Sequence, residues 1–321
     1  MLSCAAFSAG LGTFGTNAVI KAMATAPSRG TDRILRITRN VARQGTLLTA
    51  KEVQSAIRLN KGRHIVISLQ SRTEYDAGHV PGALLLEPEN LSDPASLEAF
   101  VKAIPPDKSI ILTCSNGHMS CAAMLFLRQL GLDASAMAFG MYGWNRAYAG
   151  SGAYQGDIAG EISTSTSRLP LNRLPVPEEY SELGDRPLVI GKSVGHFLFE
   201  TRPTQVRDKP DDQMLICLRR AEDYAAGHIP GAINISSEAF YSGDRIILQI
   251  PRDRKIVLSC YVGHFSAGAA LLLNQLGYNA CSLEWGMAGW NNKYIGPVLN
   301  ILQQGADLPV EHGPGADFIL S

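Results

Sequence analysis

The sequence predicts an α/β protein made of two copies of one module, each a parallel sheet with helices on both faces. Three observations support this fold class. The 321 residues, 45% of them hydrophobic, are enough for two domains with separate cores. The second half of the chain repeats the first at a nearly constant spacing. Within each copy, short apolar runs alternate with helical stretches, which is the order of elements in a parallel sheet.

The repeat is clearest around two cysteines. The sequence Ile-Ile-Leu-Thr-Cys ends at Cys114, and its counterpart Ile-Val-Leu-Ser-Cys ends at Cys260, 146 residues later. Such agreement over many positions indicates a duplicated module. The other matching segments contain turn or helix-terminal residues: 77–83 with 226–232, 129–131 with 275–277, and 143–145 with 289–291.

The apolar runs and the glycines behind them predict the main elements of each copy. A helix is expected over residues 120–130 and another over residues 266–276, ended by Gly131 and Gly277. Buried strands are expected at residues 65–67, 110–112, 214–216 and 256–258.

Composition divides the chain into five segments. We predict an N-terminal targeting segment or basic arm at 1–43, a first domain at 44–150, a linker at 151–187, a second domain at 188–300 and a C-terminal tail at 301–321. The linker is rich in Gly, Ser, Thr and Pro, which is typical of an extended connector.

The N-terminal segment leaves several interpretations open. Residues 1–20 carry no charge but are rich in small residues, so we expect no integral membrane span. The alternatives are a secretory signal peptide, a lipid anchor at Cys4, an organelle presequence that uses the arginines of residues 29–43, or a flexible basic arm. We expect an exported protein of a bacterial cell envelope, with a cytoplasmic or organellar location as the alternative.

Charge and cysteine usage exclude other classes of protein. Lysine plus arginine equals aspartate plus glutamate at 29 each, which gives no electrostatic reason to expect nucleic acid as a partner. Six scattered cysteines do not form a disulfide framework, and no Cys-x-x-Cys pair indicates a metal site. No nucleotide-binding glycine loop is present, so we expect no cofactor. Cys121, Cys217 and Cys281 are expected to be core residues.

In both copies a strand runs into the sequence Cys-x-x-Gly-His-x-Ser and then into a helix. Open α/β sheets bind their ligands at such strand-to-helix turns. Free N–H groups at the helix N-terminus stabilise a thiolate, so the cysteine pKa is expected below its free value of about 8.5. The glycine lets successive N–H groups turn inward and bind an anion. Ser120 and Ser266 are expected to cap the helices.

The combination of Ala-Gly-His-Ile-Pro-Gly-Ala, Cys-x-x-Gly-x-x-Ser and Gly-x-x-Gly-Trp resembles rhodanese-domain sulfurtransferases in their tandem two-domain form. The resemblance covers residues 45–150 and 188–296, and it implies two tandem rhodanese-like domains. It also implies Cys260, and equivalently Cys114, as a carrier of persulfide sulfur between a donor such as thiosulfate and a thiol or cyanide. The expected binding residues follow each cysteine: Ser115, Asn116, Gly117, His118, Met119 and Ser120, and then Tyr261, Val262, Gly263, His264, Phe265 and Ser266.

The chain departs from the family pattern in three respects. Met119 and Phe265 stand where many rhodaneses have an arginine, which leaves the donor open. Ser68 and Cys217 replace the acid of a common Asp-x-Arg motif, and its arginine remains only as Arg219. Familiar two-domain rhodaneses keep the cysteine only in the C-terminal copy, whereas this chain has both.

Several other residues have competing interpretations. His79 and His228 precede Pro-Gly and are expected to fix a turn by bonding to the backbone. His118 and His264 either lower the cysteine pKa and contact an anion, or face solvent. Arg219 is expected to be a structural ion-pair partner. Trp144 and Trp290 are expected to pack the ends of the modules.

Three functional classes remain open from the sequence. The first is a sulfurtransferase or sulfane-sulfur carrier, whose partners are a small sulfur-containing anion and a thiol acceptor. The second is a non-catalytic rhodanese-like docking module that binds a protein of an envelope redox or sulfur-handling complex. The third, a cysteine phosphatase or arsenate reductase, needs an arginine at the end of a longer loop, where this chain has Ser120 or Ser266.

Overall fold

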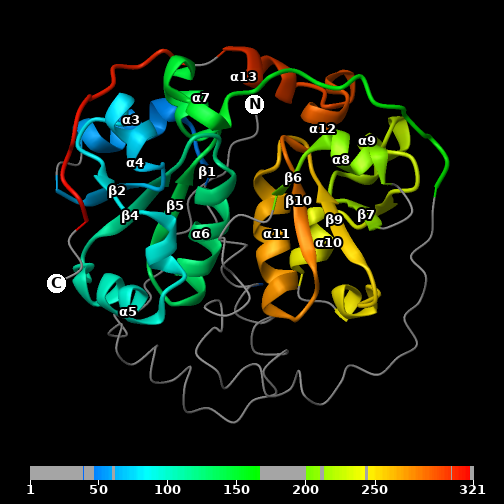
Figure 1. Ribbon diagram of the computed structural model, residues 1–321, viewed down its shortest axis with the longest axis horizontal. Helices are drawn as coiled ribbons and strands as arrows, with labels where there is room; N and C mark the ends of the chain where they lie inside the picture. The colour runs from blue at the N-terminus through cyan, green and yellow to red at the C-terminus, as the bar shows by residue number, and fades with distance from the viewer. Residues whose placement is uncertain are drawn as a thin grey trace, which may run out of the picture.

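Two five-stranded parallel sheets, one in each half of the chain, form the frame of the molecule (Figure 1). The computed structural model describes residues 39, 47–59, 62–166, 200–209, 213–242, 245–304 and 306–318. All strand pairs within these two sheets are parallel. The predicted α/β fold with two tandem domains is confirmed.

The first sheet has the strand order β1-β5-β4-β2-β3. Its strands are β1 (Leu47–Leu48), β2 (His64–Ser68), β3 (Leu84–Leu85), β4 (Ser109–Thr113) and β5 (Ala134–Met137). The helices of this domain are α3 (Ala50–Leu59), α4 (Arg72–Ala77), α5 (Pro94–Ala103), α6 (His118–Gln129) and α7 (Gly140–Trp144), with 3-10 turns η1 (Pro88–Leu91), η2 (Arg146–Tyr148) and η3 (Gly150–Gly152).

The second sheet repeats this arrangement in the order β6-β10-β9-β7-β8. Its strands are β6 (Glu200–Thr201), β7 (Gln213–Cys217), β8 (Ile233–Asn234), β9 (Lys255–Ser259) and β10 (Ala280–Leu283). The helices are α8 (Pro203–Asp208), α9 (Ala221–Ala226), α10 (Ser237–Tyr241), α11 (His264–Gln275), α12 (Gly286–Trp290) and α13 (Val298–Gln304), with 3-10 turns η6 (Arg245–Gln249) and η7 (Asn292–Tyr294).

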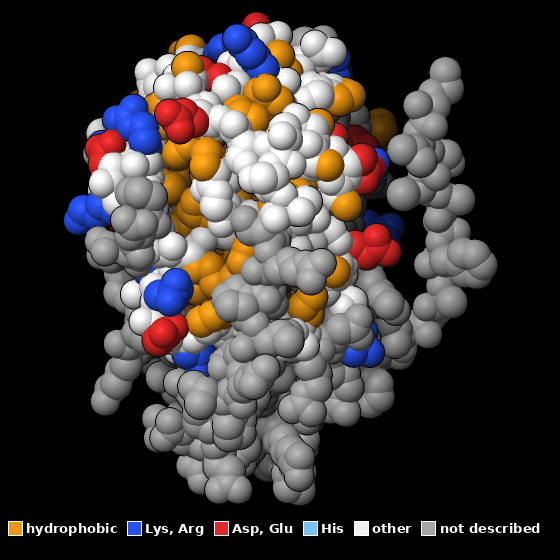
Figure 2. All heavy atoms as spheres, turned by 90° about the vertical axis from the view of Figure 1, so that its right-hand side faces the viewer, with side chains coloured by type: hydrophobic (Ala, Val, Ile, Leu, Met, Phe, Trp, Pro, Cys, Tyr) orange, Lys and Arg blue, Asp and Glu red, His pale blue; other side chains and the backbone are white. Residues whose placement is uncertain are grey.

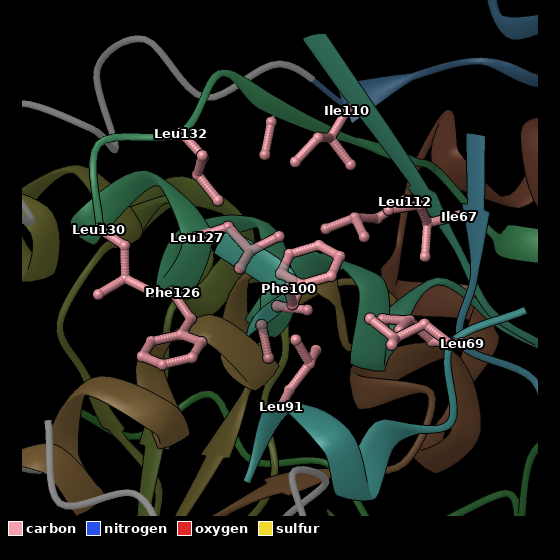
Figure 3. Close-up of a cluster of buried hydrophobic side chains, with 14 of the residues drawn as sticks. Ile67, Leu69, Leu91, Phe100, Ile110, Leu112, Phe126, Leu127, Leu130 and Leu132 are labelled. Atoms are coloured by element: carbon pink, nitrogen blue, oxygen red, sulfur yellow. The ribbon is translucent and has the colours of Figure 1, made fainter. Parts of the chain in front are cut away.

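The central strands separate two apolar layers because successive side chains of a strand point to opposite faces. In β4, Ile110 and Leu112 pack with Phe100 of α5 and Phe126 of α6 (Figure 3). Ile111, between them, packs on the other face with residues of α3 and α7. Strands buried on both faces explain why the sequence shows continuous apolar runs there.

Local sequence signals account for the ends of the helices. Asp93 caps α5 by accepting a hydrogen bond from the Ser96 N–H (2.8 Å), and proline occupies the first helical position. Helices α6 and α11 are followed by Gly131 and Gly277, which adopt left-handed φ angles of 89° and 80°. The predicted C-terminal ends of these two helices are therefore confirmed.

Helices α6 and α11 lie side by side and join the two domains (Figure 1). Ala267 and Leu271 of α11 belong to the same apolar cluster as the core of the first domain. Farther along the two helices, the Gln129 and Gln275 side chains donate hydrogen bonds to each other at 3.1 and 2.8 Å. The turns at the N-terminal ends of these helices consequently lie at the domain interface.

The segment that leaves the first domain runs along the second domain. We call residues 153–166 the first strap. Trp290 donates an indole hydrogen bond to the Glu161 carbonyl oxygen at 2.8 Å. Ser163 and His228 exchange two backbone hydrogen bonds of 2.9 and 3.0 Å. The first part of the predicted linker is thus bound to the second domain.

The segment that follows the second domain returns to the first in the equivalent way. In this second strap, residues 306–318, the Pro309 carbonyl oxygen accepts a 2.8 Å hydrogen bond from the Trp144 indole. Glu311 and His79 exchange two backbone hydrogen bonds of 3.0 Å each. The predicted C-terminal tail therefore contains α13 and a segment packed on the other domain, and both tryptophans hold a strap.

His79 and His228 fix their turns as expected. The His79 ring contacts the Tyr75 carbonyl oxygen through Nδ1 at 2.7 Å, and His228 contacts the Tyr224 carbonyl oxygen at the same distance. Each imidazole also stacks on the tyrosine ring of that residue, with ring centres 3.6 and 3.7 Å apart. These histidines belong to the frame of each domain.

The described surface mixes both signs of charge. On the face in Figure 2, basic and acidic side chains are interspersed among apolar ones. No helix in the described part of the chain is long and apolar enough to cross a membrane. Apart from residue 39, the predicted N-terminal segment 1–43 lies outside the described residues, so its targeting role stays a prediction.

The straps give a test of the fold. Replacing Trp144 or Trp290 by Phe keeps an aromatic ring but removes the indole N–H. Each substitution is expected to lower the free energy of unfolding by about 1 kcal/mol, since it leaves a strap carbonyl without its donor. Urea unfolding measures the change. An unaltered midpoint in both variants would show that the straps contribute little to stability.

Candidate active site

Two equivalent turns carry the cysteines at the carboxyl ends of the central strands. Loop 1 (residues 114–120) joins β4 to α6, and loop 2 (residues 260–266) joins β9 to α11. The predicted succession of strand, cysteine turn and helix is present in both domains. Because α6 and α11 pack together, both loops lie at the domain interface.

Loop 2 surrounds the sulfur of Cys260 with donors. The Gly263 N–H donates a hydrogen bond to Sγ at 3.1 Å, and the Ser266 hydroxyl oxygen lies 3.5 Å from Sγ. Ser266 Oγ also lies 3.1 Å from the Gly263 carbonyl oxygen and 2.8 Å from the hydroxyl of Ser282 on β10. These contacts hold the Ser266 hydroxyl beside the sulfur.

Loop 1 surrounds the sulfur of Cys114 with an equivalent set of donors. We call each set of donors around a cysteine sulfur a cradle. The Gly117 N–H donates to Sγ at 3.1 Å and the Ser120 N–H at 3.4 Å, with the Ser120 hydroxyl oxygen at 3.5 Å. The Asn116 side chain lies across the turn, where its Oδ1 accepts a 3.0 Å hydrogen bond from the His118 N–H. Both loops therefore present backbone amides to a sulfur atom.

The expected capping role of Ser120 and Ser266 is wrong. Each helix begins two residues earlier, and the N-cap positions are occupied by Gly117 and Gly263, with φ angles of 92° and 94°. Glycine is needed for this left-handed turn, which directs its own N–H at the cysteine. Both serines consequently lie within the first helical turn, where their hydroxyls reach the sulfur and a loop carbonyl.

Short helices α7 and α12 support the loops from behind. In the second domain, the Met287 N–H donates to the Cys260 carbonyl oxygen at 2.8 Å. A Cβ on Gly286 would lie 2.6 Å from that oxygen, and one on Gly140 would lie 2.1 Å from the Cys114 oxygen. The first glycine of each Gly-x-x-Gly-Trp motif is therefore required by close backbone approach.

Both cysteine side chains are almost inaccessible, with 3% of Cys114 and 2% of Cys260 exposed. Burial raises the pKa of Cys114 above its ordinary value, although hydrogen bonds from Ser120 and Gly117 act in the opposite direction. The expectation that the loop lowers the cysteine pKa is thus wrong for Cys114, because loss of hydration outweighs the amide contacts.

His118 and His264 do not face solvent. Both are buried, at 0% and 4% exposure, and each extends toward the opposite loop across the interface. The His118 Nε2 lies 2.7 Å from the Val262 carbonyl oxygen, and its Nδ1 contacts the carboxylate of Glu200. The His264 Nε2 accepts a 3.2 Å hydrogen bond from the Phe139 N–H. Of the two alternatives for these histidines, the solvent-facing one is therefore wrong.

Arg219 is structural, but it is not the expected ion-pair partner. Its buried guanidinium donates to the carbonyl oxygens of Tyr294 (2.7 Å) and Gly227 (2.5 Å) and lies 5.9 Å from the Tyr261 ring centre. Among the described residues it forms no ion pair, and backbone carbonyls accept from its Nη1 and Nη2, while its buried Nε has no hydrogen-bond partner. Gln70, at the equivalent place in the first domain, makes one weaker carbonyl contact at 3.4 Å.

The residue after each cysteine points away from the sulfur. The Tyr261 hydroxyl bonds to Asp223, and the Ser115 hydroxyl donates to Glu74 at 3.0 Å. Burial and the bond to Asp223 raise the pKa of Tyr261 to about 12, so its phenol stays protonated. These side chains fasten the loops to α9 and α4 and do not line the cradle.

The two apolar replacements of the family arginine lie in different surroundings. Phe265 of loop 2 is 49% exposed, whereas Met119 of loop 1 packs against the core of the first domain. Cys121, Cys217 and Cys281 are buried, as expected. Within the described residues, no group of His, Cys, Asp or Glu is arranged to hold a metal ion.

The sequence did not single out Glu200 or Phe139. Phe139 and Trp285 occupy equivalent positions in the two repeats, each directly before a Gly-x-x-Gly-Trp motif, with left-handed φ angles of 61° and 56°. An aromatic residue at this place in both copies is a sequence feature by which Phe139 could have been found. Glu200 has no such signal. It pairs in register with Ser282, while Leu47 pairs with Ala136, so leucine stands at the equivalent place.

Comparison with known proteins places this architecture in a family. The model of the rhodanese-like domain matches residues 49–147 and 202–293. These matches cover more than half of the chain, so the chain belongs to the rhodanese-like domain family and contains the domain twice in tandem.

Several solved structures are similar to parts of the chain. A rhodanese-related protein from Thermoplasma volcanium is 23% identical over 30% of this chain and 92% of its own, with a TM-score of 0.28. The thiosulfate sulfurtransferase from Pseudomonas aeruginosa is 15% identical over 91% of this chain and 51% of its own, with a TM-score of 0.30. A rhodanese homolog from Thermus thermophilus is 28% identical over 28% of this chain and 96% of its own, with a TM-score of 0.23.

The raised pKa of Cys114 predicts slow alkylation near neutral pH. A raised pKa means that the unreactive thiol persists to higher pH, so the iodoacetamide rate at Cys114 is expected to rise only above the midpoint of a free cysteine. Ser120→Ala removes a contact that lowers this pKa and is expected to move the midpoint further up. Peptide-resolved mass spectrometry follows the reaction, and a midpoint below that of free cysteine would contradict the prediction.

The support of loop 2 by α12 predicts a large cost for Gly286→Ala. The new Cβ would meet the Cys260 carbonyl oxygen, and the φ of 52° is unfavourable for alanine, so a loss of about 2 kcal/mol or more is expected. Gly231→Ala is the matched control, since Gly231 has a φ of 77° but open space around its Cβ position. Equal losses in urea unfolding would show that the close approach adds no cost.

Proposed function

We propose that the protein is a sulfurtransferase that carries a sulfane sulfur on cysteine as a persulfide. The observation that carries this proposal is the cradle around each Sγ, formed by the 3.1 Å glycine amide and the serine hydroxyl at 3.5 Å. A persulfide places its negative charge on the outer sulfur. Amides at a helix N-terminus stabilise such a charge without a metal or a charged side chain.

The reaction proceeds in two displacements. The cysteine thiolate attacks the outer sulfur of a donor such as thiosulfate, so that the Sγ–S bond forms while the S–S bond of the donor breaks. Sulfite leaves with the electron pair of that bond. A thiol or cyanide then attacks the outer sulfur of the persulfide, takes it up, and releases the cysteine as thiolate. No external oxidant or reductant is needed.

Cys260 is proposed as the principal carrier. Its serine neighbour Ser266 contacts a further hydroxyl, Ser282, where the first domain has Ala136. Cys114 is proposed as a second site of lower reactivity, because Ser120 has no equivalent hydroxyl partner at Ala136. The two cradles are otherwise alike, so the difference is one of degree.

The donor is proposed to be recognised by backbone amides. Phe265 and Met119 supply no charge, and loops 1 and 2 contain no lysine or arginine. A small anion such as thiosulfate therefore has the N–H groups of the turn and the helix dipole as its positive partners. Phe265, a half-exposed residue of loop 2, is the side chain available to contact an apolar part of the donor or the acceptor.

A second candidate function is docking of another protein by catalytically silent rhodanese-like domains. The low exposure of both thiols is the observation that favours it, since a larger acceptor cannot reach a sulfur so deeply buried. A cysteine phosphatase is not proposed, because Ser266 and Ser120 occupy the place of the arginine that such an enzyme requires.

Sulfur loading tests the proposal directly. Incubation with thiosulfate is expected to raise the intact mass by one sulfur atom or more, and cyanide is expected to remove the gain. Cys260→Ala is expected to abolish most of the gain and Cys114→Ala a smaller part. Cys281→Ala, a buried cysteine outside both loops, is the matched control and is expected to load normally. Absence of any gain from thiosulfate, polysulfide or mercaptopyruvate would favour the docking function.

A further inference from the structure

One peptide group in loop 2 connects Cys260 to a histidine of the other domain. The N–H of this peptide belongs to Gly263 and donates to Cys260 Sγ at 3.1 Å. Its carbonyl oxygen belongs to Val262 and lies 2.7 Å from Nε2 of His118. The two ends of a single peptide plane thus contact the sulfur and an imidazole that comes from the first domain.

The partners of His118 define its charge. A carbonyl oxygen only accepts, so Nε2 carries a proton toward Val262, while Nδ1 contacts the carboxylate of Glu200. With an acceptor on each nitrogen, the ring is held as an imidazolium. Burial alone lowers the pKa of His118, but Glu200, the Val262 carbonyl and the charge of Glu284 together raise it above its ordinary value.

The two aromatic rings near His118, those of His264 and Trp285, are uncharged, so Glu200 is the ionic partner of His118. The ring of His264 lies 5.7 Å away and that of Trp285 lies 5.3 Å away, measured between ring centres. His264 accepts the Phe139 N–H at Nε2, which requires a neutral ring. Burial and the nearby His118 charge lower the pKa of His264 to about 3. Of two repeat-equivalent histidines, only His118 is therefore cationic.

This difference follows from one position in the edge strands. Glu200 lies on β6, and the register places Leu47 at the equivalent point of β1. The second domain therefore supplies a carboxylate to the histidine of the first domain, while the reverse position offers only an aliphatic side chain. The two domains therefore differ at the one edge-strand position from which a carboxylate could hold the histidine of the other domain in its charged form.

We propose that His118 is a positioning residue for the Cys260 site and acts across the domain interface through the Val262–Gly263 peptide. This inference rests on the proposed sulfur-carrier function of Cys260. The imidazolium fixes the peptide plane so that the Gly263 N–H points at the sulfur. A hydrogen bond to a carbonyl also polarises the amide and strengthens the bond made by its N–H. Glu200 keeps His118 charged and oriented for this task.

The consequence is that the two cysteines differ in reactivity for a reason that lies outside their own loops. Cys260 depends on a residue of the first domain and is complete only when the domains are docked. At Cys114 the reciprocal contact is longer: the His264 Nε2 lies 3.4 Å from the Asn116 carbonyl oxygen, against 2.7 Å between His118 and Val262. Because the neutral His264 accepts the Phe139 N–H at Nε2, it has no proton there to donate to that carbonyl.

The test measures how the Cys260 alkylation rate depends on pH, without any sulfur donor. His118→Leu, which removes both the donor and the charge, is expected to move the midpoint up by about one pH unit, or about tenfold in rate below the midpoint. Glu200→Gln is expected to move it in the same direction by less. His118→Gln keeps an N–H for the carbonyl but loses the charge, and is expected to fall between the wild type and His118→Leu.

Gln275→Ala is the control for interface integrity. It removes a contact between α6 and α11 that is remote from both loops, and it is expected to leave the Cys260 midpoint unchanged. An equal shift in this variant would overturn the proposal, because loosening of the interface would then be the cause. If His118→Leu fails to fold, Glu200→Gln decides, and an unchanged midpoint in the folded Glu200→Gln variant overturns it.

Sulfur loading and the alkylation midpoint of Cys260 together separate the role of His118 from the sulfurtransferase function. Sulfur loading by thiosulfate with an unchanged alkylation midpoint in the His118 and Glu200 variants would leave the sulfurtransferase proposal standing and remove the role of His118. A shifted midpoint without any sulfur loading would support the positioning role and contradict sulfur transfer from the donors tested.

Discussion

The packing of α6 against α11 is the constraint on which the rest of the molecule depends. Each of these helices continues a cysteine loop, so bringing their N-terminal ends together places the two loops face to face. Ala267 and Leu271 then complete the core of the first domain, and the histidine that begins each helix becomes buried against the opposite loop. The surroundings of either sulfur thus depend on the contact between the domains.

The fold and the position of the cysteine turns could be predicted because both are encoded locally. Apolar runs, turn glycines and the repeated cysteine motif lie within short stretches of sequence, and the structure places them as expected. What could not be predicted depends on contacts between distant segments. The burial of His118 and His264 needs the relative placement of the domains, and the raised pKa of Cys114 needs the extent of its burial. Comparison of the two repeats could not identify Glu200, because the equivalent position of the first copy has a leucine.

The two domains have nearly the same backbone features, but the side chains around their cysteines differ. The glycine turns, the supporting helices and the straps recur at equivalent places in both domains. The differences gather around Cys260: Arg219 replaces Gln70, Ser282 replaces Ala136, and Glu200 replaces Leu47. Each gives the second site an added hydrogen bond or charge. A symmetric frame with unequal sites is the arrangement expected when two copies keep their packing while their functions diverge.

The exchange of straps bears on how the chain folds during synthesis. The second strap, residues 306–318, is translated after the second domain, yet it covers the first domain and accepts the indole hydrogen bond of Trp144. The first domain is therefore synthesised with that surface open, and the surface is covered only after the second domain has been made. In that interval the second strap of a neighbouring chain can occupy the same surface. Dimers that exchange this strap are therefore the misfolded species expected for this architecture.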